Sequence, residues 1–255
     1  MTPPLYLVPR GGLDGVAAGA GLTLDGPEGR HAATVRRTRP GERVDVADGS
    51  GRVAEAVVTG VDRDRVTLRV EGLVEHVPRQ PRLVLVQALA KGGRDELAVE
   101  TATELGVDAV IPWQAARCVV VWSGERGEKS RRRWEDTVRA AAKQSRRADL
   151  PPVAPAVATT ALAGRIRETG AGGGIALVLH EEARTALAGL DLPADGSPVE
   201  VLVVVGPEGG IGADELAVLT AVGAQPVRLG PQVLRSSSAG SAALAVLSAR
   251  LGRWS

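Results

Sequence analysis

The N-terminal third of the chain alternates between polar and apolar residues, whereas the rest contains continuous apolar runs separated by amphipathic stretches. Residues 43–47, 52–61 and 65–70 follow a period of two, and turns at residues 48–51 and 62–64 separate them. This period is typical of half-buried antiparallel strands. We therefore predict a small β domain over residues 1–75.

Residues 75–81 contain two prolines and no periodicity, so they form a plausible linker. The near-continuous apolar run at 83–88 is typical of a parallel strand that is covered on both faces. Strands that alternate with helices indicate an α/β domain, here over residues 76–255. The other predicted elements are strands at 109–113, 119–122, 175–179, 200–205 and 226–228, and helices at 95–105, 129–147, 162–168, 214–223 and 239–251.

Two irregular loops near the C-terminus each follow a predicted strand and precede a predicted helix. The first is Gly206-Pro207-Glu208-Gly209-Gly210, and the second covers residues 229–238. In open α/β sheets, ligands bind outside the carboxyl ends of the strands, where such loops gather. Glycines there permit positive φ and close backbone approach to a ligand. Two ordinary tight turns are the alternative interpretation.

Known phosphate loops do not match these glycines. No Lys follows them as in GxxxxGK[ST], and GxGxxG fails because Glu215 stands where the third glycine should be. A nucleoside triphosphate or a dinucleotide is therefore disfavoured. Backbone amides, apolar side chains, one carboxylate and one guanidinium suit a ligand with an adenine and a ribose but no phosphates.

GPEGG after an apolar strand, followed by LGPQVLRSSSA before an Ala-rich helix, resembles the ribosomal RNA small-subunit methyltransferase E family of the SPOUT superfamily. The resemblance continues through residues 31–37, 87–92, 102–106 and 142–145, and thus spans nearly the whole chain. One departure is Ser237, where many members carry an acidic residue. The resemblance therefore carries over no catalytic role for that acid.

The resemblance implies a SPOUT-type α/β domain with a trefoil knot over residues 76–255, preceded by a PUA-like β-barrel that binds RNA over residues 1–75. It implies S-adenosylmethionine as the cofactor, a homodimer formed by the C-terminal domain, and N3 of one uridine in 16S ribosomal RNA as the target. A ribose 2′-hydroxyl target and a non-catalytic ribosome-assembly factor on the same fold are the alternatives.

Candidate site residues lie mainly in the two loops. Arg235 is the candidate cation that stabilises an anionic uracil. Glu208 is the candidate hydrogen-bond acceptor or base, although an acid that only stabilises a helix N-terminus is the alternative. The predicted cofactor-binding residues are Leu179, His180, Gly206, Pro207, Glu208, Gly209, Gly210, Leu229, Gly230, Val233, Leu234 and Ser236.

Basic residues concentrate at residues 126–147, which contain nine Lys or Arg against Glu128, Glu135 and Asp136, although the net charge is only +1. Because these acids precede residue 139, we expect the basic run at 139–147 to be uncompensated and to bind RNA phosphates. A solvated helix face is the alternative. With four Trp, one Tyr and no Phe, a base-stacking platform is not expected. The predicted RNA-binding residues are Arg36, Arg37, Lys91, Arg132, Arg139, Lys143, Arg146 and Arg147.

Several classes of protein are disfavoured. No apolar run reaches the eighteen or so residues that span a bilayer, and the N-terminus lacks the pattern of a signal peptide. The single Cys118 cannot form an internal disulfide, and the three histidines show no metal spacing. We therefore expect a cytoplasmic protein without a metal or a membrane partner. The resemblance implies that its substrate is 16S ribosomal RNA, which we expect to be in the assembled small subunit.

Overall fold

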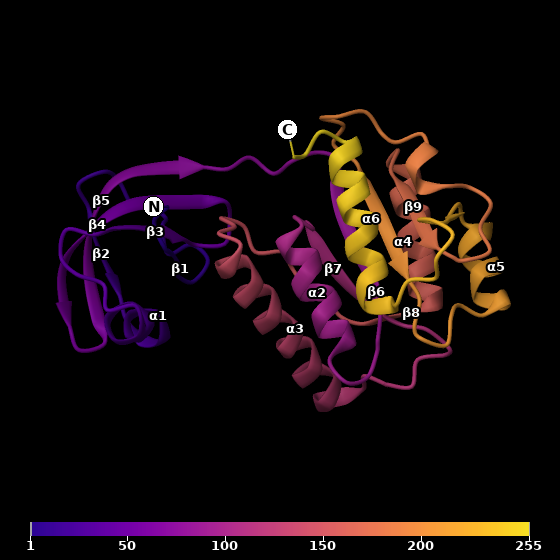
Figure 1. Ribbon diagram of the computed structural model, residues 1–255, viewed down its shortest axis with the longest axis horizontal. Coiled ribbons are helices and arrows are strands. Elements are labelled where there is room, and N and C mark those ends of the chain that lie inside the picture. Colours follow the sequence, from indigo (N-terminus) through magenta and orange to yellow (C-terminus); the bar gives the residue numbers. More distant parts are fainter. Residues whose placement is uncertain (1, 255) are drawn as a thin grey trace. The chain divides into compact units, whose positions relative to one another are not determined.

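The computed structural model describes residues 2–254, which form two compact units (Figure 1). The N-terminal unit contains the residues up to Pro78 together with Ala142–Leu150. The C-terminal unit contains Arg79–Ala141 and the residues from Pro151 onward. Residues 142–150, which lie inside the predicted second domain, thus pack with the first unit.

The N-terminal unit is built on a five-stranded sheet with the order β1-β3-β4-β5-β2. All neighbouring pairs are antiparallel except β1 and β3. The predicted strands are present, and their alternating apolar residues form the core, as Val44, Val46 and Val66 illustrate. Its elements are β1 (Leu5–Leu7), β2 (Gly21–Leu24), α1 (Gly26–Arg30), the π-helix η1 (His31–Val35), β3 (Arg43–Ala47), β4 (Arg52–Asp62) and β5 (Arg65–Glu75).

The C-terminal unit contains a six-stranded parallel sheet with the order β11-β9-β10-β6-β7-β8, which confirms the predicted α/β fold. Its elements are β6 (Arg82–Ala88), α2 (Arg94–Glu104), β7 (Ala109–Gln114), α3 (Gly124–Gln144, whose last residues belong to the other unit), β8 (Val157–Ala158), α4 (Thr159–Ala171), β9 (Ile175–Leu179), the 3-10 helix η2 (Leu187–Gly189), β10 (Glu200–Val205), α5 (Ala213–Ala221), β11 (Gln225–Val227) and α6 (Ser236–Arg250).

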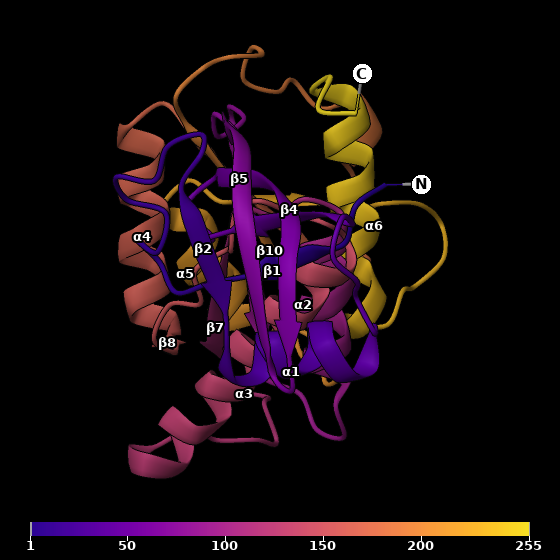
Figure 2. The same ribbon diagram turned by 90° about the vertical axis from the view of Figure 1, so that its left-hand side faces the viewer.

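Helices cover both faces of this sheet, because successive strand residues point to opposite sides. Leu83 and Leu85 pack with α2, α3 and α6, whereas Val84 and Val86 pack with α4 and α5. Figure 2 shows the sheet between α4 on one side and α6 on the other. The apolar run of β6 is therefore buried throughout, as its composition predicts.

The structure differs from the sequence prediction in one strand and in the bounds of several helices, such as α4 and α6, which begin three residues earlier than predicted. The strand predicted at 119–122 is wrong, because that segment joins no sheet. Its exposure still alternates, with Val119 and Val121 outward and Val120 partly buried, so the apolar pattern reflects one-sided packing without a strand partner. The helix predicted at 129–147 spans Gly124–Gln144 instead, and Trp134 and Val138 on it are buried.

Candidate functional site

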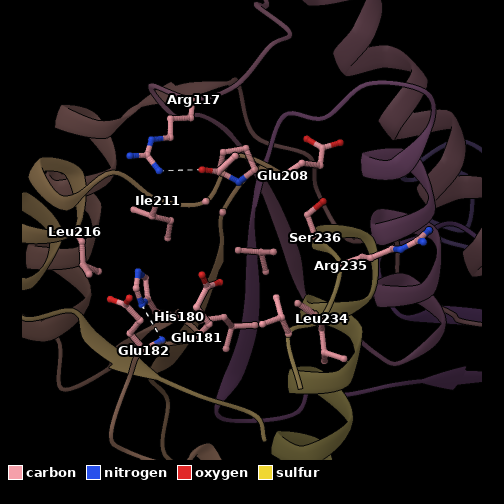
Figure 3. A pocket seen from close by; sticks show the side chains of 18 of the residues that line it. Arg117, His180, Glu181, Glu182, Glu208, Ile211, Leu216, Leu234, Arg235 and Ser236 are labelled. Atoms are coloured by element: carbon pink, nitrogen blue, oxygen red, sulfur yellow. Dashed lines mark hydrogen bonds between the residues drawn. The ribbon is translucent and has the colours of Figure 1, made fainter. Parts of the chain in front are cut away.

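A cavity of about 900 Å³ opens at the carboxyl ends of β9 and β10. The turn after β10 forms one wall, and the segment before α6 forms the opposite wall (Figure 3). Apolar residues such as Ile211 and Leu216 line it together with charged ones. The lining residues are Arg94, Arg117, Leu179, His180, Glu181, Glu182, Val205, Gly206, Pro207, Glu208, Gly209, Gly210, Ile211, Ala213, Leu216, Val233, Leu234, Arg235, Ser236 and Ala239.

A smaller cavity of about 80 Å³ adjoins the first and shares Leu179, His180 and Leu234 with it. Leu229 and Gly230, from the loop after β11, line this second space. The site therefore gathers loops that follow three neighbouring parallel strands, as the carboxyl-end rule predicts.

The turn after β10 depends on its glycines. Gly210 has a φ of +71°, a left-handed conformation that side-chain-bearing residues rarely adopt, and its N–H donates to the carbonyl of Pro207 at 2.9 Å. A Cβ on Gly206 would lie 2.6 Å from Cγ1 of Ile211. The turn thus packs directly against a cavity-lining side chain, and the backbone shape of this wall is fixed.

Two helices begin at the cavity. Ala213 opens α5 and lines the cavity, and Arg235 is the N-cap of α6, where its carbonyl accepts from the N–H groups of Ser238 and Ala239. Helix N-termini carry partial positive charge and favour anionic groups. This part of the site therefore favours a ligand carboxylate.

Glu208 is held by Arg94, whose Nη1 donates to Oε1 of Glu208 at 2.8 Å. Burial opposes ionisation of Glu208, but hydrogen bonds from its own backbone N–H and from Arg94, with the charges of Arg94 and Lys91, bring its pKa below the usual value. A carboxylate with a lowered pKa is a weak base. Of the two roles expected from the sequence, the geometry favours hydrogen-bond acceptor.

Arg117 and Arg235 occupy opposite sides of the site. Nη1 of Arg117 donates to the carbonyl of Gly209 at 2.9 Å, whereas the side chain of Arg235 runs away from the middle of the cavity (Figure 3). The segment that carries Arg117 is held by Glu215, which accepts from the N–H of Ala116 at 2.9 Å. The side chain of Arg235, the cation expected from the sequence, therefore points away from the cavity. Arg117 lines the opposite side of the cavity.

All twelve residues predicted to bind the cofactor line one or both cavities. Arg94 and Arg117 were not predicted, although Gly92 and Gly93 directly precede Arg94 and both have positive φ; only the segment of Arg117 lacks a glycine. Both arginines follow the carboxyl ends of strands, β6 and β7, so the rule applied to the glycine loops would have found them. Glu181 and Glu182 directly follow the predicted His180 and were missed for lack of a motif.

Comparison with known proteins gives two family matches. Residues 78–248 match a family described as "RNA methyltransferase domain", and residues 24–71 match "RNA methyltransferase PUA domain". The chain is 50% identical over 236 residues to "Ribosomal RNA small subunit methyltransferase E" of Mycobacterium tuberculosis, covering 92% of this chain and 89% of the relative. The chain belongs to the ribosomal RNA small subunit methyltransferase E family.

Solved structures agree with this membership. The family member from Neisseria gonorrhoeae, described as bound to S-adenosyl methionine, matches with a TM-score of 0.86 at 25% identity, covering all of both chains. A putative methyltransferase from Legionella pneumophila, described as in complex with the bound cofactor SAM, matches with a TM-score of 0.83 at 27% identity, covering 98% of each chain. The expected SPOUT-type and PUA-like organisation is thus confirmed at the level of the fold.

The basic residues predicted in this family member to bind RNA differ in their surroundings. Arg36, Arg37, Lys91, Arg132 and Arg139 are exposed. The expectation that residues 139–147 are uncompensated is wrong for two cations, since Nζ of Lys143 lies 2.7 Å from Oε2 of Glu28 and Arg147 pairs with Asp149 at 2.5 Å. Burial and the charge of Glu55 raise the pKa of Asp45 above its usual value, and the charge of exposed Arg146 opposes them.

Residues 2–254 contain neither a candidate membrane span nor a candidate metal centre. No helix there is both long and apolar enough to cross a bilayer. No group of three or more His, Cys, Asp or Glu side chains in that range is arranged to hold a metal ion.

Proposed function

We propose that this member of the ribosomal RNA small subunit methyltransferase E family transfers a methyl group from S-adenosylmethionine to N3 of a specific uridine in 16S ribosomal RNA. The observation that carries the proposal is the cavity at the carboxyl ends of β9 and β10, lined by the two loops on which the family resemblance rests. The relative of known structure that is described as bound to S-adenosyl methionine covers the whole chain.

The lining residues fit S-adenosylmethionine. Leu179, Ile211 and Leu234 offer apolar surface for an adenine, and the carboxylates of Glu181 and Glu182 suit ribose hydroxyls or an ammonium group. The N-termini of α5 and α6 suit a carboxylate. When bound, the cofactor supplies a methyl group on a sulfonium, which is a good leaving group without protonation. The protein then mainly positions the two reactants.

We assign roles to the chain's own residues on the same basis. Glu208 accepts a hydrogen bond from the substrate or from the ribose, in competition with Arg94, and Arg235 approaches the substrate at the edge of the cavity. Exposed arginines at 36, 37, 132, 139 and 146, with Lys91, contact phosphates of the RNA. The N-terminal unit supplies the RNA-binding PUA-like surface, and the C-terminal unit supplies the cofactor site.

The deciding experiment compares ribosomal RNA from cells with and without this gene by mass spectrometry of digested nucleosides. The proposal expects 3-methyluridine in the small-subunit RNA only when the gene is present. A missing 2′-O-methyl nucleoside would assign another target atom, and no missing nucleoside would favour an assembly factor. Purified protein that fails to bind S-adenosylmethionine in a calorimetric titration would reject the enzyme outright.

We further propose a homodimer formed through the C-terminal unit, a trefoil knot around the second ligand loop, and a cytoplasmic location, where small ribosomal subunits are available as substrate. Light scattering tests the dimer. The expected mass is that of two chains, and the mass of one chain at micromolar concentration would reject it.

A further inference from the structure

Three arginines line the main cavity, and their charges are compensated differently. Arg94 pairs with Glu208, so its charge is neutralised within the site. Arg235 is exposed, and its side chain is directed outward (Figure 3). Arg117 lines the edge of the cavity on the opposite side, beside the turn after β10 (Figure 3), and in residues 2–254 no carboxylate forms a salt bridge with it. It uses one N–H for the carbonyl of Gly209.

The backbone that carries Arg117 is fixed from several sides. Cys118, Val120 and Trp122 are partly buried and pack against the core, so the alternate residues, Arg117 included, point away from the core and are exposed. The ring of Trp122 meets Trp134 edge to face at a centroid distance of 5.0 Å. This packing sets the direction in which residue 117 points.

Glu215 adds a second anchor from the start of α5. Its Oε1 accepts from the N–H of Ala116 at 2.9 Å and from Oγ1 of Thr159 at 2.6 Å, and its side chain is buried. The backbone at Arg117 is therefore fixed before substrate arrives, and the carbonyl of Gly209 holds its guanidinium. A preorganised cation of this kind stabilises charge that develops during a reaction without reorganising at that moment.

We propose that Arg117 is a catalytic residue that stabilises the negative charge on a uracil oxygen as N3 loses its proton. This role rests on the proposed function. In the step, the N3 proton passes to solvent, and the N3 electron pair forms the bond to the methyl carbon. The bond between that carbon and sulfur breaks, and its electron pair stays on sulfur. The guanidinium favours the uracil anion and so lowers the pKa of N3–H in the site.

The test compares Arg117→Ala, Arg117→Lys and the control Arg167→Ala, which removes an exposed arginine of α4 outside the cavity. The substrate is small ribosomal subunits from cells that lack the methyltransferase. We expect Arg117→Ala to lower kcat at neutral pH by about 100- to 1,000-fold, the typical cost of one oxyanion-stabilising group. The loss should shrink as pH rises, because solvent then deprotonates N3 without help. Arg117→Lys should recover part of the rate.

Calorimetric titration with S-adenosylmethionine supplies an independent readout. The S-adenosylmethionine affinity of Arg117→Ala should stay within about threefold of the wild-type affinity, which is less than a tenfold change in Kd. A large loss of affinity, or an equal loss of kcat at every pH, would overturn the catalytic role and make Arg117 a cofactor ligand or a support for the turn. If the wild-type protein forms 3-methyluridine and Arg117→Ala forms it at the same rate, the role of Arg117 is rejected but the proposed function is not. A different methylated nucleoside from wild type would instead reject the proposed function.

Discussion

The loops at the carboxyl ends of β9, β10 and β11 differ instructively from the C-terminal end of α3. In the loops, the shape of the cavity follows from the backbone, which glycines determine locally, as the positive φ of Gly210 shows. At the end of α3, the proposed contact with RNA depends on which charges remain unpaired. Glu28, the partner of Lys143, is 115 positions away in sequence. Local sequence therefore located the loops that line the cavity but overestimated the number of uncompensated cations.

The largest expected effect on binding comes from Gly210→Val, which tests the importance of backbone shape at the cavity. A β-branched residue at a φ of +71° is strained by about 1–3 kcal/mol, and changing the turn relieves the strain. Because the turn forms a wall of the cavity, S-adenosylmethionine affinity should fall by about 10- to 100-fold, as a calorimetric titration would measure.

The matched control is Gly223→Val, which has a φ of +101°, open space around its Cβ position and no contact with either cavity. Gly223→Val should be less stable than wild type, but its affinity for S-adenosylmethionine should be unchanged. Equal affinity losses in both variants would mean that strain acts through the fold as a whole. Gly209→Val is a poorer probe, because its Cβ would meet Cβ of Arg117 at 3.3 Å rather than open into the cavity.

Much of the fold was predictable from the sequence, for physical reasons. The buried run of β6 and the alternation in β3 to β5 are local patterns, and both correspond to observed strands. The short strand β1 is only three residues long, too short for a period to show. The segment at 119–122 has the composition of a strand but no partner, because pairing depends on tertiary neighbours.

The same limit applies to the site. Glycine motifs marked the loops after β10 and β11, whereas Arg117 lies in a segment without a motif and reaches the cavity only through packing and the bond from Ala116 to Glu215. The outward direction of Arg235 is likewise a tertiary property (Figure 3). Sequence located the backbone of the site but not the direction of its long cationic side chains.

A second prediction separates free from paired cations on α3 through the salt dependence of RNA binding. Each phosphate contact contributes about 0.7–0.9 to the slope of log affinity against log salt concentration. Arg139→Ala should flatten the slope by about that amount, since Arg139 is exposed and forms no salt bridge in residues 2–254. Lys143→Met should change it much less, because Lys143 is paired with Glu28. Equal flattening in the two variants would show that Lys143 leaves Glu28 when RNA binds.

The smallest expected effect is a titration shift at His31, whose ring lies edge to face with Tyr6 at 6.3 Å between centroids. Burial is the largest cause that brings the pKa of His31 below 6.5, and the charges of Lys143 and Arg36 act in the same direction against Glu28. Lys143→Met removes one of these charges, so the pKa of His31 should rise toward 6.5 in an NMR titration. Arg139→Ala is the control, because it changes the same helix and leaves Lys143 in place.

The lowered pKa of His31 also makes the stability of the protein depend on pH. Because the folded-state pKa of His31 is below 6.5, the unfolded chain binds more protons between the two values, so stability rises with pH across that window and is fully present above 6.5. In Lys143→Met the folded value lies closer to 6.5, so this rise should be smaller. Denaturant unfolding at several pH values measures it. An unchanged rise, with an unchanged His31 titration, would mean that Lys143 does not remain beside Glu28 in solution, and the end of α3 would then be available to RNA as the sequence alone suggested.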